Sequence, residues 1–260
     1  AHIKKKLPSM YHQFKQLADL DITQEPMEIG PTTHYFMGGI QVEGDTQMTS
    51  VPGLFAAGEC AAGLHGANRL GGNSLSDLLV FGKRAGEHAG IFARDQGTTA
   101  AGAVADQIAS AIRRAEAPFE RGPSGENPFA IQHELQAMMQ EWVGIVRVEE
   151  ELRRALEGIA ALRLRAQRVG VGGNREYNTG WHTALDLECL LTVAELVARA
   201  GLERKESRGG HFRDDYPSKD AAWGEVNVEI HRASDGSAEL RRVPVKPMPP
   251  ALRQVIEENK

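Results

Sequence analysis

A histidine beside a glycine pair is the first group of residues in this chain that could do chemistry. His34 lies in the stretch Thr-His-Tyr-Phe-Met-Gly-Gly, which ends at Gly38 and Gly39. Paired glycines let a flat ligand approach the backbone closely, and a nearby histidine can donate a hydrogen bond to an anion. The alternative is a structural histidine beside a bulged strand, and these residues alone leave the choice open.

Arg69 is the second candidate, because it places a fixed cation directly before a predicted helix start. It lies in the glycine-rich segment 63–73 (GLHGANRLGGN), and Asn73 or Ser74 can cap a helix that carries Asp77 in its first turn. A guanidinium binds a carboxylate through two parallel hydrogen bonds, and N–H groups at a helix N-terminus favour negative charge. The segment therefore predicts an anion site, with a structural ion pair as the alternative.

Glu59 is the third candidate and follows the short apolar run 54–57, which predicts a buried strand. In nucleotide-binding sheets, ligand hydroxyls often meet an acidic residue at the carboxyl end of a strand. A solvated turn glutamate is the alternative. The fingerprint G-x-G-x-x-G, which binds a dinucleotide pyrophosphate, does not occur in the sequence, and no spacing typical of metal ligands or of a catalytic nucleophile is present.

Bulk composition excludes several classes of protein. The formal net charge of −5 is spread along 260 residues, whereas a nucleic-acid-binding protein needs a basic face. No apolar run reaches the roughly 18–20 residues of a membrane span. Cys60 and Cys189 lie far apart, which fits a reducing compartment better than a disulfide scaffold or a zinc site.

Most of the chain is predicted to be helical. A helix should follow Lys6 with Pro8 in its first turn, and residues 101–200 should form a helical bundle, its third helix ending at Gly201. A hairpin turning at Asp235-Gly236 should join strands at 225–231 and 239–243. The apolar stripes predicted to form the core are Ile131, Leu135, Met138, Trp142 and Ile145; Val148, Leu152, Leu156, Ile159 and Leu162; and Leu185, Cys189, Leu190, Val193 and Val197.

Five stretches, in this order, resemble the flavoprotein subunits of succinate dehydrogenase and fumarate reductase: HIKKKLP, PTTHYFMGGI, VPGLFAAGECA, HGANRLGGNSLSDLLVFGKRAG and RKESRGGHFRDDYP. The resemblance implies an α/β plus α fold, with the C-terminal part of a Rossmann-like FAD-binding domain, a helical bundle and a small β-containing C-terminal domain. The implied boundaries are 1–25 (end of a capping domain), 26–95 (FAD-binding domain), 96–203 (helical domain) and 204–260 (C-terminal domain). The residues of the segment AAGECAAGLHGANRLGGNSLSDLLVFGKRAG resemble those of bacterial succinate dehydrogenases, in particular actinobacterial ones.

The family pattern implies a role for each candidate residue. His34 and Arg69 would bind one carboxylate of succinate or fumarate. Glu59, the backbone of Ser74 and Leu75, and the Gly38-Gly39 pair would bind FAD. The histidine that links FAD covalently and the proton-shuttling arginine of the family have no counterpart in this sequence, so we expect the chain to be a fragment that is inactive alone.

The resemblance also implies partners and a location. The protein would oxidise succinate by hydride transfer to FAD, and would pass electrons to an iron–sulfur subunit and then, through membrane anchor subunits, to quinone. It would sit at the cytoplasmic face of the bacterial inner membrane as a peripheral subunit of respiratory complex II, serving the tricarboxylic acid cycle. Three alternatives stay open: the fumarate-reducing direction, L-aspartate oxidase, which shares the ESRG-x-H loop, and a non-catalytic assembly fragment.

Overall fold

The computed structural model describes residues 2–30, 32–96 and 104–259. The chain divides into two compact units, Ala1–His34 and Tyr35–Lys260. In the described part of the chain, no helix is long and apolar enough to span a bilayer.

The first unit contains the predicted N-terminal helix. Helix α1 (His2–Lys6) is followed by α2 (Pro8–Ala18), in which Pro8 occupies the first turn as expected. Asp19 ends α2 in the left-handed conformation, and its carboxylate accepts a 2.6 Å hydrogen bond from Lys15. The sequence therefore located this helix and its start correctly.

The strand expected over residues 54–57, in the second unit, is not formed. Only Phe55 of that run pairs, in an isolated antiparallel bridge with Met48, and Leu54 is 51% exposed. The prediction of a buried strand is wrong. Gln47 adopts a positive φ of 62° and Gly58 one of 78°, so the backbone turns away from the strand direction at both ends of this short pairing.

Helix α3 (Asn73–Gln96) begins where the capping residues predicted. It packs against η1 (Gly58–Cys60), and Leu78 of α3 covers the face of Gly58 where any side chain would lie. After the gap at 97–103, α4 (Ala105–Arg121) is tied to later segments by Arg121, whose Nε donates to the Val169 carbonyl at 2.6 Å.

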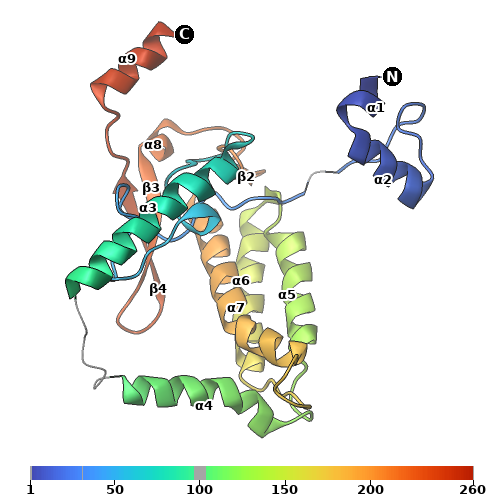
Figure 1. The fold of residues 1–260 in the computed structure, drawn as a ribbon, viewed down its shortest axis with the longest axis vertical. Coiled ribbons are helices and arrows are strands. Elements are labelled where there is room, and N and C mark those ends of the chain that lie inside the picture. Colours follow the sequence, from blue (N-terminus) through green and yellow to red (C-terminus); the bar gives the residue numbers. More distant parts are fainter. Residues whose placement is uncertain (1, 31, 97–103, 260) are drawn as a thin grey trace. The chain divides into compact units, whose positions relative to one another are not determined.

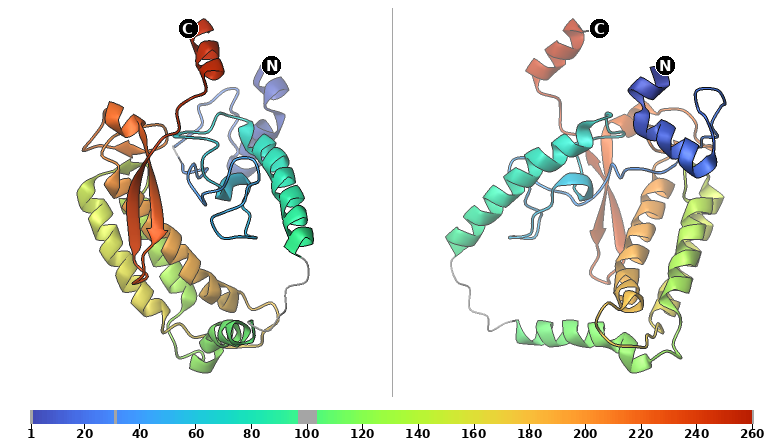
Figure 2. Two further views of the ribbon diagram at one scale, coloured as in Figure 1. Left: turned by 90° about the vertical axis from the view of Figure 1, so that its left-hand side faces the viewer. Right: turned by 45° about the vertical axis from the view of Figure 1, so that its right-hand side comes forward.

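Three helices form the core of the second unit: α5 (Pro128–Trp142), α6 (Glu149–Ala166) and α7 (Thr179–Glu203). Figures 1 and 2 show them side by side along most of their length. The first two predicted stripes face this core: the members that are buried are Ile131, Leu135, Met138, Leu152, Ile159 and Leu162.

The third predicted stripe is wrong. Leu185 and Val193 are 39% and 49% exposed, and the buried face of α7 carries Leu187, Leu191, Ala194, Ala198 and Gly201. Helix α7 is apolar on most sides, so its periodicity does not single out one face. The small residues on the buried face let α5 and α6 pack closely, and this tertiary packing makes the choice.

Gly201 was predicted to end the third helix of the bundle, but α7 continues past it. It is buried inside the helix, which continues to Glu203, and its carbonyl accepts a 2.8 Å hydrogen bond from Nη1 of Arg213. Arg213 is fully buried and forms a bidentate pair with Asp215, with both distances 2.7 Å. A guanidinium therefore satisfies the helix C-terminus where a glycine cap had been expected.

The C-terminal part carries two small sheets and two helices. Strands β1 (Val146–Arg147) and β2 (Phe212–Arg213) pair in parallel. After α8 (Ala221–Gly224), β3 (Val226–Arg232) and β4 (Ala238–Pro244) form the predicted hairpin, which Figure 2 shows lying along the helices, and α9 (Pro250–Glu258) ends the chain. Both sheets of the described residues have two strands, so the expected nucleotide-binding sheet is represented only by isolated bridges such as Ile40 to Ala61.

Glu206 is the most enclosed acid of the structure. Its side chain is fully buried between Arg204, at 2.6 Å, and Arg208, at 2.7 and 3.0 Å, and it also accepts from the Asp220 amide at 2.9 Å. Burial by itself raises the pKa of this carboxyl, but the hydrogen bonds from Arg208, from the Asp220 amide and from Arg204 outweigh it and lower the pKa to about 2. The ionised form is therefore part of the fold.

Replacing Leu152 by alanine tests the three-helix core. Leu152 is fully buried, so Leu152→Ala should lower the free energy of unfolding by about 2–5 kcal/mol through lost burial and a residual cavity. Leu164→Ala, on the exposed side of the same helix, is the matched control and should cost less than about 1 kcal/mol. Urea unfolding followed by circular dichroism measures both, and equal losses would contradict the assigned core.

The depressed pKa of Glu206 predicts a pH dependence of stability. Its contribution is fully present above the ordinary pKa of 4.5 and is lost as pH falls towards about 2. The difference in unfolding free energy between wild type and Glu206→Gln should therefore shrink from pH 6 to pH 2. Glu157→Gln, at an exposed position of α6, should leave the wild-type pH profile unchanged. A pH-independent difference for Glu206→Gln would refute the ionised buried pair.

Candidate functional site

A buried polar network lies where the glycine-rich segment meets α3. The Tyr35 hydroxyl donates to Oδ2 of Asp77 at 3.4 Å, and Nε2 of His65 reaches the same oxygen at 3.2 Å. The side chains of His65 and Asp77 are only 8% and 5% exposed. Burial, followed by the charges of Asp77 and Glu59, raises the pKa of Tyr35. The phenol therefore stays neutral and acts as a hydrogen-bond donor.

Arg69 lies over this network without a carboxylate partner. Its guanidinium carbon is 4.4 Å from the centroid of the Tyr35 ring, and Nη1 makes only a 3.5 Å contact with the Leu70 carbonyl. Within the described ranges, no acidic side chain pairs with Arg69, and its buried Nε has no hydrogen-bond partner. The structural ion pair considered for this arginine is therefore not formed, which leaves its charge available to an anion.

Glu59 is linked to the segment that carries the glycine pair. Its Oε1 accepts a 3.0 Å hydrogen bond from the Phe36 amide. Because one oxygen is held in this way and the side chain is exposed, the other oxygen can accept from a ligand hydroxyl. Glu59 lies in η1, at a turn, and not at the end of a strand.

The two glycines of the pair have different surroundings. At Gly39 the position of a side chain is occupied by the carbonyl of Cys60, whose oxygen also accepts from the Ile40 amide at 2.8 Å. Gly39 thus lets two backbone segments approach each other. Nothing lies within 4 Å of the corresponding position at Gly38, so its backbone is open to a ligand.

The start of α3 completes the arrangement. Ser74 is half-buried and Leu75 is 70% exposed in the first turn, where N–H groups have no acceptor inside the helix. Gly71 and Gly72 before them have open space on their side-chain positions. An anion or a polar ligand edge can therefore approach these amides and the positive end of the helix dipole.

The loop between α7 and α8 packs against the glycine-rich segment. Gly209, with φ +60°, lies so close to the Ala67 carbonyl that a methyl group there would overlap it, and the Gly210 amide donates to this carbonyl at 2.9 Å. His211 fixes the loop from the other side: Nε2 donates to the Arg204 carbonyl at 3.1 Å, and Nδ1 accepts from Arg147 at 3.0 Å. Burial, with the nearby arginines, lowers the pKa of His211, so the ring stays neutral and Nδ1 can accept from Arg147.

The structure brings together most, but not all, of the sequence-predicted residues. Glu59, Gly38 and Gly39 meet through the 36–40 segment, and Arg69 precedes Ser74 and Leu75 at the helix start. His34 is the last residue of the first unit, and Tyr35, which follows it directly, begins the second. Its role at the site stays a prediction.

Sequence reasoning missed the residues around Arg69. Tyr35, His65 and Asp77 lie in the motifs that resemble the family, but nothing in their spacing indicates that Tyr35 and His65 meet one oxygen of Asp77. Asp77 was expected only as an acid in the first turn of the helix, whereas it is buried and accepts from two side chains. The Gly209 contact with Ala67 joins segments about 140 positions apart and has no local signal.

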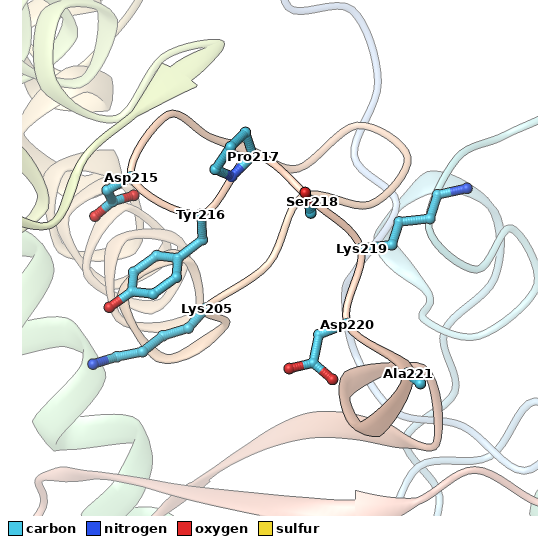
Figure 3. A pocket seen from close by; sticks show the side chains of 8 residues that line it. All are labelled: Lys205, Asp215, Tyr216, Pro217, Ser218, Lys219, Asp220 and Ala221. Atoms are coloured by element: carbon cyan, nitrogen blue, oxygen red, sulfur yellow. The ribbon is translucent and has the colours of Figure 1, made fainter.

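A hollow of about 540 Å³ lies in the loop between α7 and α8 (Figure 3). Its acids are already engaged: Asp215 pairs with Arg213 and accepts from the Glu149 amide, and Asp220 accepts from the Ala222 amide. Figure 3 shows Lys219 pointing away from the others. The residues that line the hollow are Lys205, Asp215, Tyr216, Pro217, Ser218, Lys219, Asp220 and Ala221. The charged groups of this hollow are therefore paired or directed away from it, and they do not form a candidate site. Among described residues, no group of three or more His, Cys, Asp or Glu is arranged to hold a metal ion.

Gly209→Ala tests the contact that supports the Arg69 segment. The added methyl would displace the Ala67 carbonyl, so hydrogen exchange at the Gly210 amide should accelerate at least about tenfold. Gly122→Ala is the control, because Gly122 has a similar φ of +66° but nothing within 4 Å. It should cost only about 1 kcal/mol of stability and leave exchange at Gly210 unchanged. Equal exchange in both variants would contradict this contact.

Comparison with known proteins places these features in a family. A family model described as fumarate reductase flavoprotein C-term matches residues 132–255, and one described as FAD binding domain matches residues 1–75. The fumarate reductase flavoprotein subunit of Haemophilus influenzae is 36% identical over 251 residues, covering 94% of this chain and 41% of the relative. The succinate dehydrogenase flavoprotein subunit of Coxiella burnetii is 36% identical over 257 residues, covering 94% and 43%.

A solved structure gives the same assignment. The Mycobacterium smegmatis Sdh1 structure in complex with UQ1 superimposes with a TM-score of 0.84 at 47% identity, covering 99% of this chain and 43% of that one. The chain thus spans about two fifths of the length of the relatives it matches. It belongs to the succinate dehydrogenase/fumarate reductase flavoprotein family, whose cofactor is FAD.

Proposed function

We propose that this chain is part of the flavoprotein subunit of a succinate dehydrogenase that oxidises succinate to fumarate. The observation that carries the proposal is Arg69: a cation stacked on an aromatic ring, unpaired by any acid of the described residues, directly before a helix N-terminus. An arginine in this state suits a carboxylate ligand, because the guanidinium fork binds both oxygens at once.

The residues of the chain fit an FAD molecule at three places. Glu59 has an oxygen left to accept from a hydroxyl, Gly38 has open space beside its backbone, and the amides at Ser74 and Leu75 suit a group that gains negative charge. When bound, FAD supplies the acceptor for the hydride that leaves one carbon of succinate, and a proton leaves the neighbouring carbon.

The residues of this chain would position the dicarboxylate substrate. Arg69 would bind one carboxylate of the dicarboxylate, and His34 would donate a hydrogen bond to the same carboxylate, on the pattern of the family. Fixing one end of a four-carbon chain orients its central bond for reaction. The Gly38-Gly39 segment and η1 would line the cofactor side of this arrangement.

The direction and the partners belong to the proposal. Succinate oxidation is its first candidate direction, supported by the Coxiella burnetii relative named succinate dehydrogenase flavoprotein subunit and by the 47% identity to the Mycobacterium smegmatis Sdh1 structure. The fumarate reductase flavoprotein subunits at 36% identity keep fumarate reduction as the second candidate. An iron–sulfur subunit and membrane anchor subunits would carry the electrons to quinone. The complex would lie at the cytoplasmic face of the bacterial inner membrane, with this subunit peripheral.

Arg69→Lys tests the proposed carboxylate ligand in the full-length flavoprotein within its complex. A point cation cannot replace the bidentate fork, so kcat/KM for succinate should fall by about a hundredfold or more, equivalent to a few kcal/mol. Arg84→Lys, at an exposed position of α3, is the matched control and should retain wild-type kinetics. Dye reduction with succinate measures both, and wild-type kinetics in Arg69→Lys would remove Arg69 from the site.

A further inference from the structure

We infer that Tyr35 and Asp77 are positioning residues that set the orientation of the Arg69 guanidinium, with Asp77 as the buried anchor. The inference deepens the proposed function and rests on it, because it assumes that Arg69 receives the dicarboxylate.

Arg69 is supported by an aromatic ring. A guanidinium can be fixed by acids or by an aromatic face, and here the aromatic face does so, at 4.4 Å from the Tyr35 centroid. An acid would hold the arginine equally well but would neutralise the charge that a carboxylate ligand needs. A ring holds the plane of the fork and leaves that charge available. Stacking on Tyr35 therefore fixes the guanidinium and leaves it able to bind a carboxylate.

The Tyr35 ring is itself held by neighbouring side chains. Tyr35 is fixed at its hydroxyl, which lies 3.4 Å from Oδ2 of Asp77 and 3.3 Å from Nε2 of His65. A carboxylate only accepts, so the phenol and the imidazole both donate towards this one oxygen. The His65 ring also meets the Tyr35 ring edge-on, with centroids 5.4 Å apart. Rotation of the Tyr35 side chain is thus opposed at both its hydroxyl and its ring.

The residue that anchors Tyr35 belongs to α3. Asp77 is 5% exposed and lies one turn into α3, so the carboxylate is fixed by a long helix. His65 and Arg69 come from the same irregular segment, and Tyr35 comes from a separate one. Asp77 therefore ties the two segments to the helix start that follows Arg69. The chain of contacts runs from helix to carboxylate, to phenol, to guanidinium.

Three variants in the full-length flavoprotein and its complex test this chain of contacts. Tyr35→Leu removes the ring, while Tyr35→Phe and Asp77→Asn keep it and weaken only its anchor. The probe is malonate, a dicarboxylate without the carbon–carbon bond that is oxidised, and its Kd is measured by calorimetry. We expect Kd to rise about tenfold in Tyr35→Leu and about threefold in the other two, with FAD content unchanged.

Tyr11→Leu is the matched control. Tyr11 carries a cation over its ring, Lys4 at 4.2 Å, and a carboxylate on its hydroxyl, Asp21 at 3.4 Å. It has the same pair of contacts as Tyr35 but a lysine in place of Arg69. Malonate affinity should be that of the wild type in this variant.

A double-mutant cycle separates positioning from a general structural role. In the Arg69→Lys background the flexible ammonium depends little on the ring, so adding Tyr35→Leu should change the malonate Kd by no more than about twofold. Equal effects of Tyr35→Leu in both backgrounds would overturn the inference. Wild-type affinity in Tyr35→Phe and Asp77→Asn would overturn the anchor. Wild-type affinity in Arg69→Lys alone would instead refute the proposed function.

Discussion

The stacking of Arg69 on Tyr35 is the interaction on which the site depends. A buried or half-buried cation in a protein is normally paired with an acid, because desolvation is otherwise unfavourable. Here the π face of a phenol takes the place of the acid, and the acid is moved one step away, behind the ring. This displacement lets one network hold the guanidinium while its charge stays unpaired by any acid of the described residues.

The rest of the second unit supports that arrangement from a distance. Gly209 and Gly210 pack on the Ala67 carbonyl, which lies two residues before Arg69. Their loop is fixed by Glu206 between two arginines and by Arg213 at the end of α7. The loop of residues 206–213 therefore connects the three-helix core of α5, α6 and α7 to the segment that carries Arg69.

Much of the fold could be predicted from residue patterns. The start of α3 at Asn73, the stripes of α5 and α6, and the hairpin at Asp235-Gly236 were all expected, because capping, helical period and turn chemistry act between near neighbours. The buried face of α7 was not, since a helix that is apolar on most sides carries no single period. The strand expected at 54–57 failed because its few residues lie between backbone turns at Gln47 and Gly58.

For the site, the sequence by itself determined which chemistry was available: an arginine before a helix start, a glycine pair beside a histidine, and motifs that resemble one flavoprotein family. Only the tertiary structure decided that Arg69 has a ring and no acid beneath it, that Asp77 turns inward to hold that ring, and that Gly209 packs on Ala67. The reason is physical. Residue type and local spacing set what a side chain can donate or accept, but the partner it meets depends on contacts between segments far apart in the chain, which no local pattern encodes.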